Sequence, residues 1–307
     1  MKNFLPRKLL AVSALALMSG AAFAADLPHY KAPPPPPPPP PPLWTGFYVG
    51  LNAGYTWSNN NSTNIVTFPG FINVGGVSPL GLNHALSAAA GANAAISTRA
   101  DGFIGGGQIG YNWQFYNNFL AGIEADIQGV ASSNGAGTVS TLVTGAGFPA
   151  NPTLTAMTAT KRVDYLGTVR GRLGWLFTPT LLVYGTGGLA YGGVTSNAGL
   201  FGAETPPAGP NNGAWATAGA FSDTRVGWTA GGGLEWMFWP NWSAKVEYLY
   251  YDLGRVTYAL APIVQTFPAA PYWTHFPTAT TRFNGNIVRV GVNYHFNWGA
   301  APVVAKY

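Results

Sequence analysis

Residues 185–190 are the part of the sequence whose spacing most closely matches a known chemical motif. They read Gly-Thr-Gly-Gly-Leu-Ala and fit the G-x-G-x-x-A pattern that cradles the phosphates of a dinucleotide. That function needs a helix that begins directly after the glycines. No helical pattern follows here, and the motif lies inside a longer apolar stretch, residues 181–194. We therefore predict close backbone packing at these glycines and no nucleotide site.

Residues that could bind a metal or act as nucleophiles are few. The chain has no cysteine, and its four histidines, His29, His84, His275 and His295, are too far apart in sequence for a metal motif. A lipid-cleaving enzyme built on a β-barrel would need a serine, a histidine and a carboxylate within hydrogen-bonding distance of one another. No H-x-S pair occurs in the sequence. We expect solvated loop histidines, no catalytic residue, no metal site and no cofactor. The alternative is that His84 and His275 meet on external loops and contact a metal or haem.

Eight charged residues are the remaining candidates for a functional site. They lie on the polar face of segments in which apolar and polar side chains alternate. Unpaired charges in a narrow interior would be costly, so we predict a hydrogen-bonded network of ion pairs along the axis of the fold. A proton path or an ion-selectivity filter is the alternative. The four acidic and four basic residues are Glu124, Asp126, Glu235, Glu247, Arg170, Arg172, Lys245 and Arg289.

Strands with a period of two are the elements that would place these charges on one face. Residues 47–57, for example, carry apolar side chains such as Leu51 on one face and polar ones such as Asn52 on the other. In the segment 163–177 the predicted apolar face comprises Val163, Tyr165, Val169, Leu173, Trp175 and Phe177. Eight segments show this period: 47–57, 102–115, 119–130, 163–177, 181–194, 224–239, 242–253 and 283–296.

The connections between these segments alternate between short and long. Short turns are predicted around residues 116–118, 178–180 and 240–241. Long loops rich in small and polar residues are predicted at 58–101, 131–162, 195–223 and 254–282. Outer-membrane barrels have short periplasmic turns and long external loops. The pattern therefore predicts an all-β fold, an eight-stranded antiparallel transmembrane β-barrel with long extracellular loops, short periplasmic turns and both termini in the periplasm.

Composition supports a surface covered by lipid. Charged residues make up 8% of the chain and aromatic residues 14%, with 41 glycines. A soluble β-sandwich needs a charged exterior, which these strands lack. The most apolar stretch, residues 181–194, contains five glycines and is too short for a membrane-spanning helix. Lipid of the outer membrane is thus an expected partner of the strands.

Aromatic residues at the strand ends predict two girdles at the membrane interfaces. The periplasmic girdle would contain Trp113, Phe115, Phe119, Trp175, Phe177, Phe238, Trp239, Trp242, Tyr294 and Phe296. The outer girdle would contain Tyr55, Trp57, Phe103, Tyr191 and Tyr250.

The N-terminus predicts export from the cytoplasm. Three basic residues precede an apolar run and a small-residue cleavage site, so residues 1–24 are predicted to be a signal peptide. Ten consecutive prolines make residues 25–43 a stiff periplasmic segment, with a polyproline rod about 31 Å long. Without the signal peptide, 15 basic residues become 12 against 10 acidic ones, so the mature net charge is +2. No nucleic-acid partner is expected from so small a charge without a basic patch.

A family resemblance rests on motifs distributed along residues 44–296. These motifs resemble the strands of RopB-type outer-membrane immunogenic proteins, which are opacity-type small β-barrels often placed in a porin family. The motifs are W-T-G-F-Y-V-G-L-N-A-G-Y from Trp44, G-G-Q-I-G-Y-N-W from Gly106, A-G-I-E-A-D from Ala121, G-T-V-R-G-R-L-G-W from Gly167, L-V-Y-G-T-G-G-L-A-Y from Leu182, K-V-E-Y-L-Y-Y-D-L-G from Lys245 and V-R-V-G-V-N-Y-H-F from Val288.

The resemblance implies a non-enzymatic component of the cell envelope of a Gram-negative bacterium, with roles in envelope integrity and host interaction. Its loops would contact host or other extracellular ligands. The alternatives are a small porin with narrow conductance and a surface receptor for haem or a host molecule. Such barrels usually end on an aromatic residue that the barrel-assembly machinery recognises. Phe296 is the expected assembly signal, although residues 297–307 follow it as a C-terminal extension and the terminal Tyr307 could substitute.

Overall fold

The computed structural model describes residues 43–71, 86, 88–116, 118–133, 135–144, 152–204, 214–266 and 271–296. The predicted signal peptide, residues 25–42 of the proline-rich segment and the predicted C-terminal extension lie outside these residues. His29 and His84 also lie outside them. No helix of the described part is long and apolar enough to cross a membrane.

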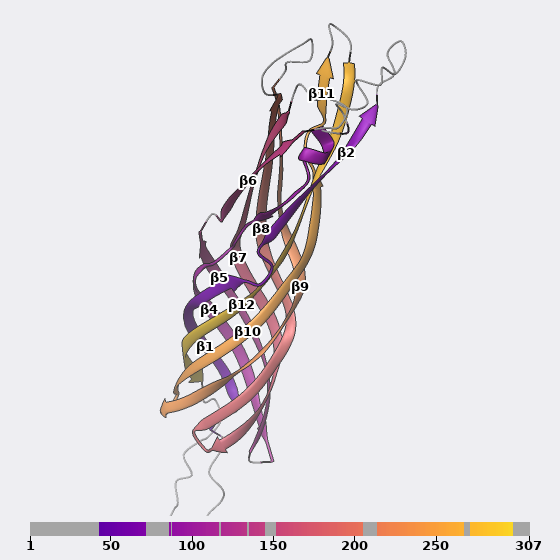
Figure 1. The fold of residues 1–307 in the computed structure, drawn as a ribbon. Helices are drawn as coiled ribbons and strands as arrows, with labels where there is room; N and C mark the ends of the chain where they lie inside the picture. The colour runs from indigo at the N-terminus through magenta and orange to yellow at the C-terminus, as the bar shows by residue number, and fades with distance from the viewer. Residues whose placement is uncertain are drawn as a thin grey trace, which may run out of the picture. The chain divides into compact units, whose positions relative to one another are not determined.

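Eight long strands form a closed antiparallel barrel. They are β1 Gly46–Ser58, β4 Gly102–Phe115, β5 Phe119–Ser132, β7 Thr153–Thr178, β8 Leu181–Glu204, β9 Trp215–Trp239, β10 Trp242–Ala259 and β12 Pro271–Phe296. Each is hydrogen-bonded to the next in this order, and β1 pairs with β12 to close the ring (Figure 1). Because Phe47 lies opposite Phe296, the first and last strands of the barrel meet at the same end. The predicted eight-stranded barrel is confirmed.

Four shorter strands extend the wall at one end. They are β2 Ser62–Phe71, β3 Ala94–Ser97, β6 Ala136–Val143 and β11 Ile263–Thr266. β2 continues the path of β1 along β12, since Ser58 lies opposite Gly285 and Thr63 opposite Thr281. In the same way β6 continues the path of β5 along β7. Figure 1 shows β2, β6 and β11 towards the end of the barrel opposite the short turns.

Strands therefore occupy much of the sequence that we predicted as long loops. β7 begins at Thr153, ten residues before the predicted start, and β8 continues to Glu204. Residues 153–160 alternate between buried and more exposed positions, but small and polar side chains conceal this period in the sequence. Strand structure is possible there because the backbone groups pair with β6 and β8 on either side.

The three predicted short turns are confirmed. They join β4 to β5, β7 to β8 and β9 to β10. Tyr116 and Asn241 adopt left-handed backbone conformations with φ of 46° and 73°, as tight hairpins require. The Asn241 side chain donates a hydrogen bond of 2.7 Å to the carbonyl oxygen of His295, which ties this turn to the end of β12.

Two β-bulges change which residues point into the barrel. The pairing of β7 with β8 shifts at Asp164, between Val163 and Tyr165. Val163 is consequently only 2% exposed and faces inward, so our assignment of Val163 to the outer apolar face was wrong. The bulge inserts one extra residue and so reverses the alternation beyond it. A second bulge on β10 contains Gly254, whose φ of +85° is a conformation that favours glycine.

The barrel interior consists of three layers. Nearest the short turns, an apolar layer contains Trp44, Leu120, Leu176, Leu182, Tyr184 and Met237. The predicted charges form the middle layer. Towards the other end, a larger apolar layer includes Ile104, Met157, Leu166, Leu249, Leu253 and Phe283. The charge network thus occupies the middle of the barrel axis, between the two apolar layers.

The outer surface carries an apolar band between two aromatic girdles. Predicted girdle residues such as Trp239 and Phe103 are 69% and 73% exposed, and Trp228, which we did not predict, is 52% exposed. Trp228 and Trp239 lie eleven positions apart on β9, which corresponds to about 28 Å along the axis at a tilt near 40°. That height matches the apolar band of an outer-membrane barrel, and the strands extend beyond it at the end opposite the turns.

Candidate functional site

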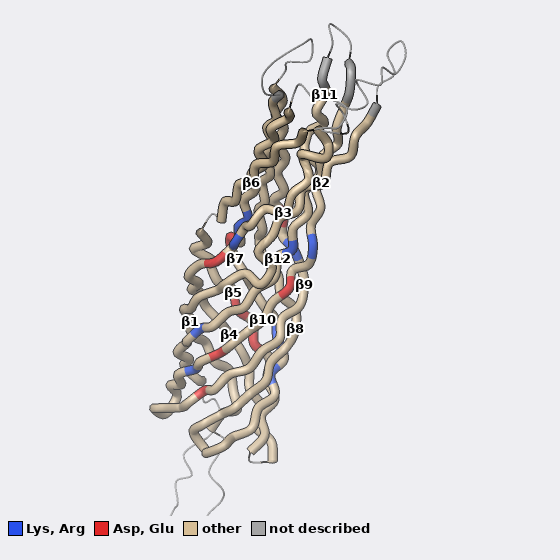
Figure 2. Tube along the Cα trace, viewed as in Figure 1, with Lys and Arg blue, Asp and Glu red and all other residues tan. Residues whose placement is uncertain are grey.

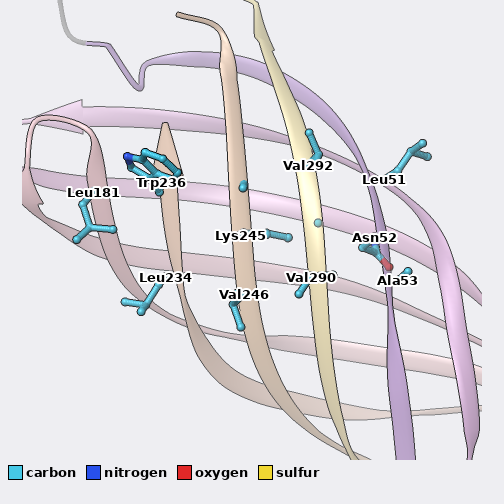
Figure 3. Close-up of a pocket in the computed structure, with 12 residues that line it drawn as sticks. Leu51, Asn52, Ala53, Leu181, Leu234, Trp236, Lys245, Val246, Val290 and Val292 are labelled. Carbon is cyan, nitrogen blue, oxygen red and sulfur yellow. The ribbon is translucent and has the colours of Figure 1, made fainter. Parts of the chain in front are cut away.

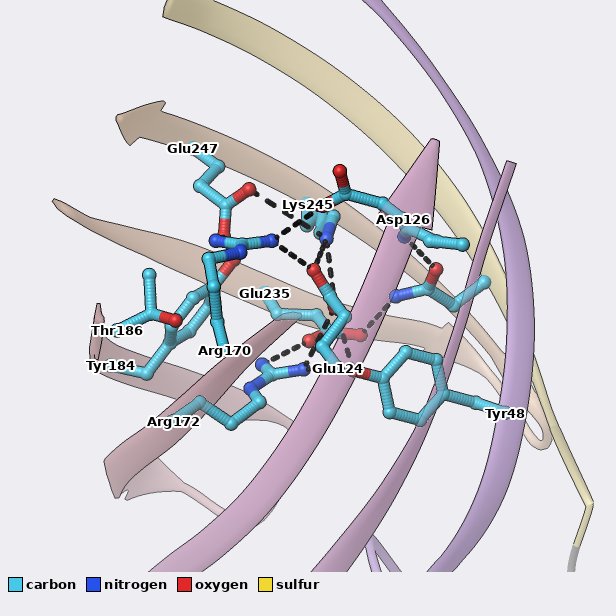
Figure 4. A network of polar contacts seen from close by, with 12 residues as sticks. Tyr48, Glu124, Asp126, Arg170, Arg172, Tyr184, Thr186, Glu235, Lys245 and Glu247 are labelled. Atoms are coloured by element: carbon cyan, nitrogen blue, oxygen red, sulfur yellow. Dashed lines mark hydrogen bonds and ion pairs between the residues drawn. The ribbon is translucent and has the colours of Figure 1, made fainter. Parts of the chain in front are cut away.

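The charged layer brings all eight predicted residues together. They project from the inward faces of β5, β7, β9, β10 and β12, and none is more than 5% exposed. Figure 4 labels all of them except Arg289 and shows the labelled side chains converging on one region of the lumen, where acidic groups meet basic groups from other strands. Figure 2 shows that charged residues gather along the middle of the barrel and that both extremes are almost without them. The predicted ion-pair network is therefore present in the structure.

Arg170 of β7 lies at the centre of this network. One of its terminal nitrogens contacts Glu124 and lies 2.9 Å from the Asp126 carboxylate, while the other lies 2.9 Å from Glu247. Arg289 lies 2.8 Å from the same Asp126 and donates from Nε to Glu247 at 2.7 Å. These shared carboxylates link β5, β7, β10 and β12 across the lumen.

Glu124 is the acidic residue with the most cationic neighbours. Lys245 Nζ donates to both of its carboxylate oxygens at 2.9 and 3.0 Å. Arg172 lies 3.7 Å from it and makes its shorter ion pair, of 2.6 Å, with Glu235. With four acidic and four basic groups, the layer is electrically balanced, and each carboxylate is neutralised by at least one cation.

Several further polar residues complete the network, and we did not predict them as members. Tyr48 donates to Glu124 at 2.6 Å, and Tyr184 donates to Glu247 at 3.0 Å. The Arg172 guanidinium lies 4.0 Å from the centre of the Tyr184 ring, a cation–π arrangement. The alternation along β1 could have identified Tyr48, because it lies four positions before Asn52 and therefore points to the same, inward face of the strand. Gly110 leaves room for Tyr48, since a Cβ there would lie 2.4 Å from the phenol group.

A polar chain extends from Glu235 towards the end of β12. Asn293 donates to Glu235 at 2.7 Å, and the hydroxyl of Ser243 does so at 2.6 Å. His295 Nε2 lies 2.9 Å from the Ser243 hydroxyl and 3.4 Å from Glu235. The alternation along β12 could have predicted that Asn293 and His295 face inward, because they lie an even number of positions after Arg289.

The histidines differ from our expectation of solvated loop residues. His275 and His295 both lie on β12 and are 1% and 2% exposed. We expected His275 to be solvated because it lies in the predicted loop 254–282, but an inward-facing position on β12 buries it. His295 lies in the segment 283–296, which we predicted as a strand, and it also faces inward. Among the described residues, no three His, Cys, Asp or Glu side chains form a group that could hold a metal ion.

The glycine-rich motif at residues 185–190 lies entirely within β8. Its glycines pair with β7 and β9, and Gly188 lies directly opposite Arg170. A Cβ at Gly188 would lie 2.2 Å from the carbonyl oxygen of Val169, so close backbone approach requires glycine. The motif therefore serves strand packing, as the absence of a following helical pattern indicated.

A shallow groove of about 790 Å³ lies on the outer face of the barrel (Figure 3). Its lining comes from β1, β8, β9, β10 and β12, and the small side chains of Ala53 and Ala244 form part of it. Larger side chains flank them, including Leu51, Trp236, Val246 and Val290. The groove is almost wholly apolar and lies within the band between the two aromatic girdles.

The comparisons with known proteins agree with this architecture. Residues 10–296 match the family model described as an outer membrane protein beta-barrel domain. The chain belongs to this family. Membership places the barrel in the outer membrane, and the end with the short turns and both barrel termini then faces the periplasm.

Two relatives within this outer-membrane family are immunogenic proteins of Brucella. The chain is 34% identical over 293 residues to the 31 kDa outer-membrane immunogenic protein of Brucella melitensis, covering 94% of this chain and 100% of the relative. It is 27% identical over 295 residues to the 25 kDa outer-membrane immunogenic protein of Brucella abortus, covering 94% of this chain and 98% of the relative. The resemblance to outer-membrane immunogenic proteins is thus confirmed.

Among solved structures, the chain is similar to the outer membrane protein OprG from Pseudomonas aeruginosa. The TM-score is 0.34 with 8% sequence identity, and the match covers 82% of this chain and 97% of that one. A second match is Ail of Yersinia pestis, with a TM-score of 0.26, 10% identity and coverage of 80% and 99%.

Lys161 is a buried cation of β7 just outside the membrane-spanning part of this barrel. Its ammonium donates to the carbonyl oxygen of Asn60 at 2.9 Å and to that of Arg282, and lies 5.1 Å from the centre of the Phe283 ring. Burial lowers the pKa of Lys161 to about 8, and the negative charge of Asp101 opposes this shift only in part. Protonation of Lys161 is therefore less favourable in the folded protein than in the unfolded chain.

We expect the free energy of unfolding to rise with pH between about 8 and the ordinary lysine pKa of 10.5. In that window the unfolded chain binds a proton at Lys161 that the folded chain has lost, so raising the pH favours folding, by roughly 3 kcal/mol in total. Below pH 8 both states hold the proton and the contribution is constant. Urea unfolding at several pH values, for the wild type and Lys161→Met, measures this. An identical rise in both proteins would contradict the assignment.

Proposed function

We propose that this protein is a non-enzymatic structural component of the outer membrane whose lumen is closed to solutes and whose outer end contacts the host or the environment. The observation that carries this proposal is the filling of the lumen by three successive layers. Two are apolar and one is a balanced network of buried ion pairs. An eight-stranded barrel has an interior that its own side chains can fill, which supports a plug rather than a pore.

The absence of catalysis is part of this proposal. The carboxylates of Glu124, Asp126, Glu235 and Glu247 accept hydrogen bonds from Arg or Lys and are buried inside the barrel, where they cannot act as a general base on an outside substrate. The side chains of Ser243 and His295 are buried in the lumen, out of reach of a lipid or peptide substrate. A haem receptor gains no support from His275, which is also buried.

Contacts at the outer end are supported by apolar side chains that remain exposed beyond the outer girdle. Phe68 of β2 and Phe276 of β12 lie opposite each other and are 59% and 49% exposed, and Leu142 of β6 is 59% exposed. Apolar groups gathered on a surface outside the lipid are typical of sites that bind another molecule. Within the membrane, the groove beside Leu51 and Val290 fits acyl chains of the surrounding lipid.

Assembly through Phe296 stays a prediction. Phe296 is the last residue of β12, and its ring packs edge-to-face on Tyr294 with 5.1 Å between ring centres. An aromatic residue at the end of the closing strand is the feature that we expect the barrel-assembly machinery to bind.

Conductance in planar lipid bilayers tests the closed lumen. We expect no stepwise current from the wild type, with a general porin in the same bilayers as a positive control. The charge-balanced double variant Glu124→Ala/Arg170→Ala should also remain silent, because Leu166, Leu249 and Phe283 still fill the outer apolar layer. Stable steps from the wild type would favour the small porin. Stepwise current from the double variant but not from the wild type would show that the charged layer is what closes the lumen.

A further inference from the structure

Three arginines lie together at the outer boundary of the membrane. Arg255 of β10 and Arg282 of β12 are directly opposed across the two strands, and both are exposed. Arg225 of β9 extends towards the neighbouring bulge, with a terminal nitrogen 3.7 Å from the position of a Cβ at Gly254. On the membrane side of this arginine cluster, the rings of Trp228 and Tyr250 pack with 5.3 Å between their centres.

The arrangement is unfavourable without an anion. Like charges directly opposite each other in a sheet are destabilising. Arg282 is paired with the buried carboxylate of Asp252, but Arg255 has no ion pair or side-chain hydrogen bond among the described residues. Nε of Arg225 is buried and lacks a hydrogen-bond partner within the described part of the chain. The exposed guanidinium of Arg255 therefore presents unused donors to the surface, whereas the buried Nε of Arg225 does not.

Nearby acidic residues do not neutralise the arginine cluster. Asp223 is exposed and accepts a hydrogen bond of 2.7 Å from the backbone N–H of Thr224. Counting Asp223 and Asp252 against three arginines leaves a net charge of +1. Lys161 donates to the carbonyl oxygen of Arg282, and the negative charge of Asp101 acts on Lys161, so these two opposite charges leave the count unchanged. Arg162 forms a separate exposed pair of 2.7 Å with Asp164.

We propose that Arg225, Arg255 and Arg282 bind the phosphate headgroup of a lipid in the outer leaflet. Guanidinium groups match phosphate oxygens in planar, paired hydrogen bonds. The height of the cluster, directly above exposed Trp228, is the height at which headgroups lie. The Trp228–Tyr250 pair offers apolar and aromatic surface to the sugar or upper acyl portion of the same molecule, which a free phosphate ion would leave unused. This inference requires the outer-membrane location but does not depend on whether the lumen conducts.

Retention of phosphorylated lipid tests the proposal. The full chain would be purified from outer membranes, exchanged into detergent and titrated with lipid A carrying its phosphates, with bound lipid counted by native mass spectrometry. We expect the variant Arg225→Gln/Arg255→Gln to bind about tenfold more weakly than the wild type. Arg282 is kept in this variant because its removal would leave Asp252 buried without a partner. Arg162→Gln is the matched control and should bind as the wild type does.

A second arm uses only the wild type and so does not depend on how a variant folds. Dephosphorylated lipid A should bind about tenfold more weakly than the phosphorylated form. Inorganic phosphate at millimolar concentration should not displace the lipid. Equal binding of both lipid A forms, equal loss in the Arg162→Gln control, or displacement by inorganic phosphate would each overturn the proposal, the last by indicating a site for free anions.

Discussion

Replacing Arg170 by alanine is expected to lower the free energy of unfolding by about 3–5 kcal/mol. Arg170 contacts the carboxylates of Glu124, Asp126 and Glu247, and all of these side chains are almost completely buried. Removing the guanidinium leaves three negative charges close together in a medium of low polarity, with fewer hydrogen-bond donors. The cost arises from that uncompensated charge and not from the loss of one attractive pair.

Urea unfolding in lipid vesicles, followed by the mobility difference between folded and heated protein on a gel, measures this effect. Arg162→Ala is the matched control, because Arg162 lies on the same strand and forms an ion pair of 2.7 Å with Asp164. The side chains of Arg162 and Asp164 are 46% and 37% exposed. An exposed pair of this kind contributes about 0–1 kcal/mol. Similar small losses for both variants would mean that the charged layer contributes little to stability.

Introducing arginine at Val290 is expected to destabilise the barrel by about 2–4 kcal/mol. Val290 is 56% exposed on the outer face of β12, midway between Phe296 and the arginine cluster at Arg282. A guanidinium at this height would have to enter the hydrocarbon region or bend towards an interface. The same vesicle unfolding experiment measures the change.

Phe276→Arg on the same strand is the control for Val290→Arg. Phe276 is 49% exposed, close to the value for Val290, but it lies six positions beyond Arg282 on the outer side. If the strands project from the membrane there, arginine meets water and the cost should be below about 1 kcal/mol. An equal cost at both positions would show that lipid covers the projecting part as well.

The charged layer and the apolar layers have different consequences for the lumen. Ion pairs in a narrow barrel can exchange partners, and a barrel closed by them alone could open transiently. In this protein, Leu166, Leu249 and Phe283 belong to a second closure that has no charge to rearrange. The small-porin alternative therefore requires movement in the outer apolar layer as well as in the network.

The sequence alone was sufficient for the barrel and its chemistry in outline. Period-two alternation and the spacing of short turns predicted eight strands, and each predicted segment lies within one of the long strands. The position of Glu124, Arg170 and the other six charged residues on the polar faces of these strands also predicted that they would meet inside the barrel. These inferences succeed because a strand has a strict two-residue repeat and a narrow barrel has only one interior.

Only the tertiary structure decided the rest. A bulge at Asp164 reverses the alternation along β7, and sequence does not reveal it because Val163 and Tyr165 are both apolar. β7 and β8 extend to Thr153 and Glu204 because neighbouring strands complete their backbone hydrogen bonds. The local amino-acid composition does not show which strands will be neighbours. The pairing of Arg170 with three particular carboxylates depends on register across strands, which is set by the whole closed sheet. Thus residue types determined that charges would lie inside the barrel, and strand pairing determined which of them touch.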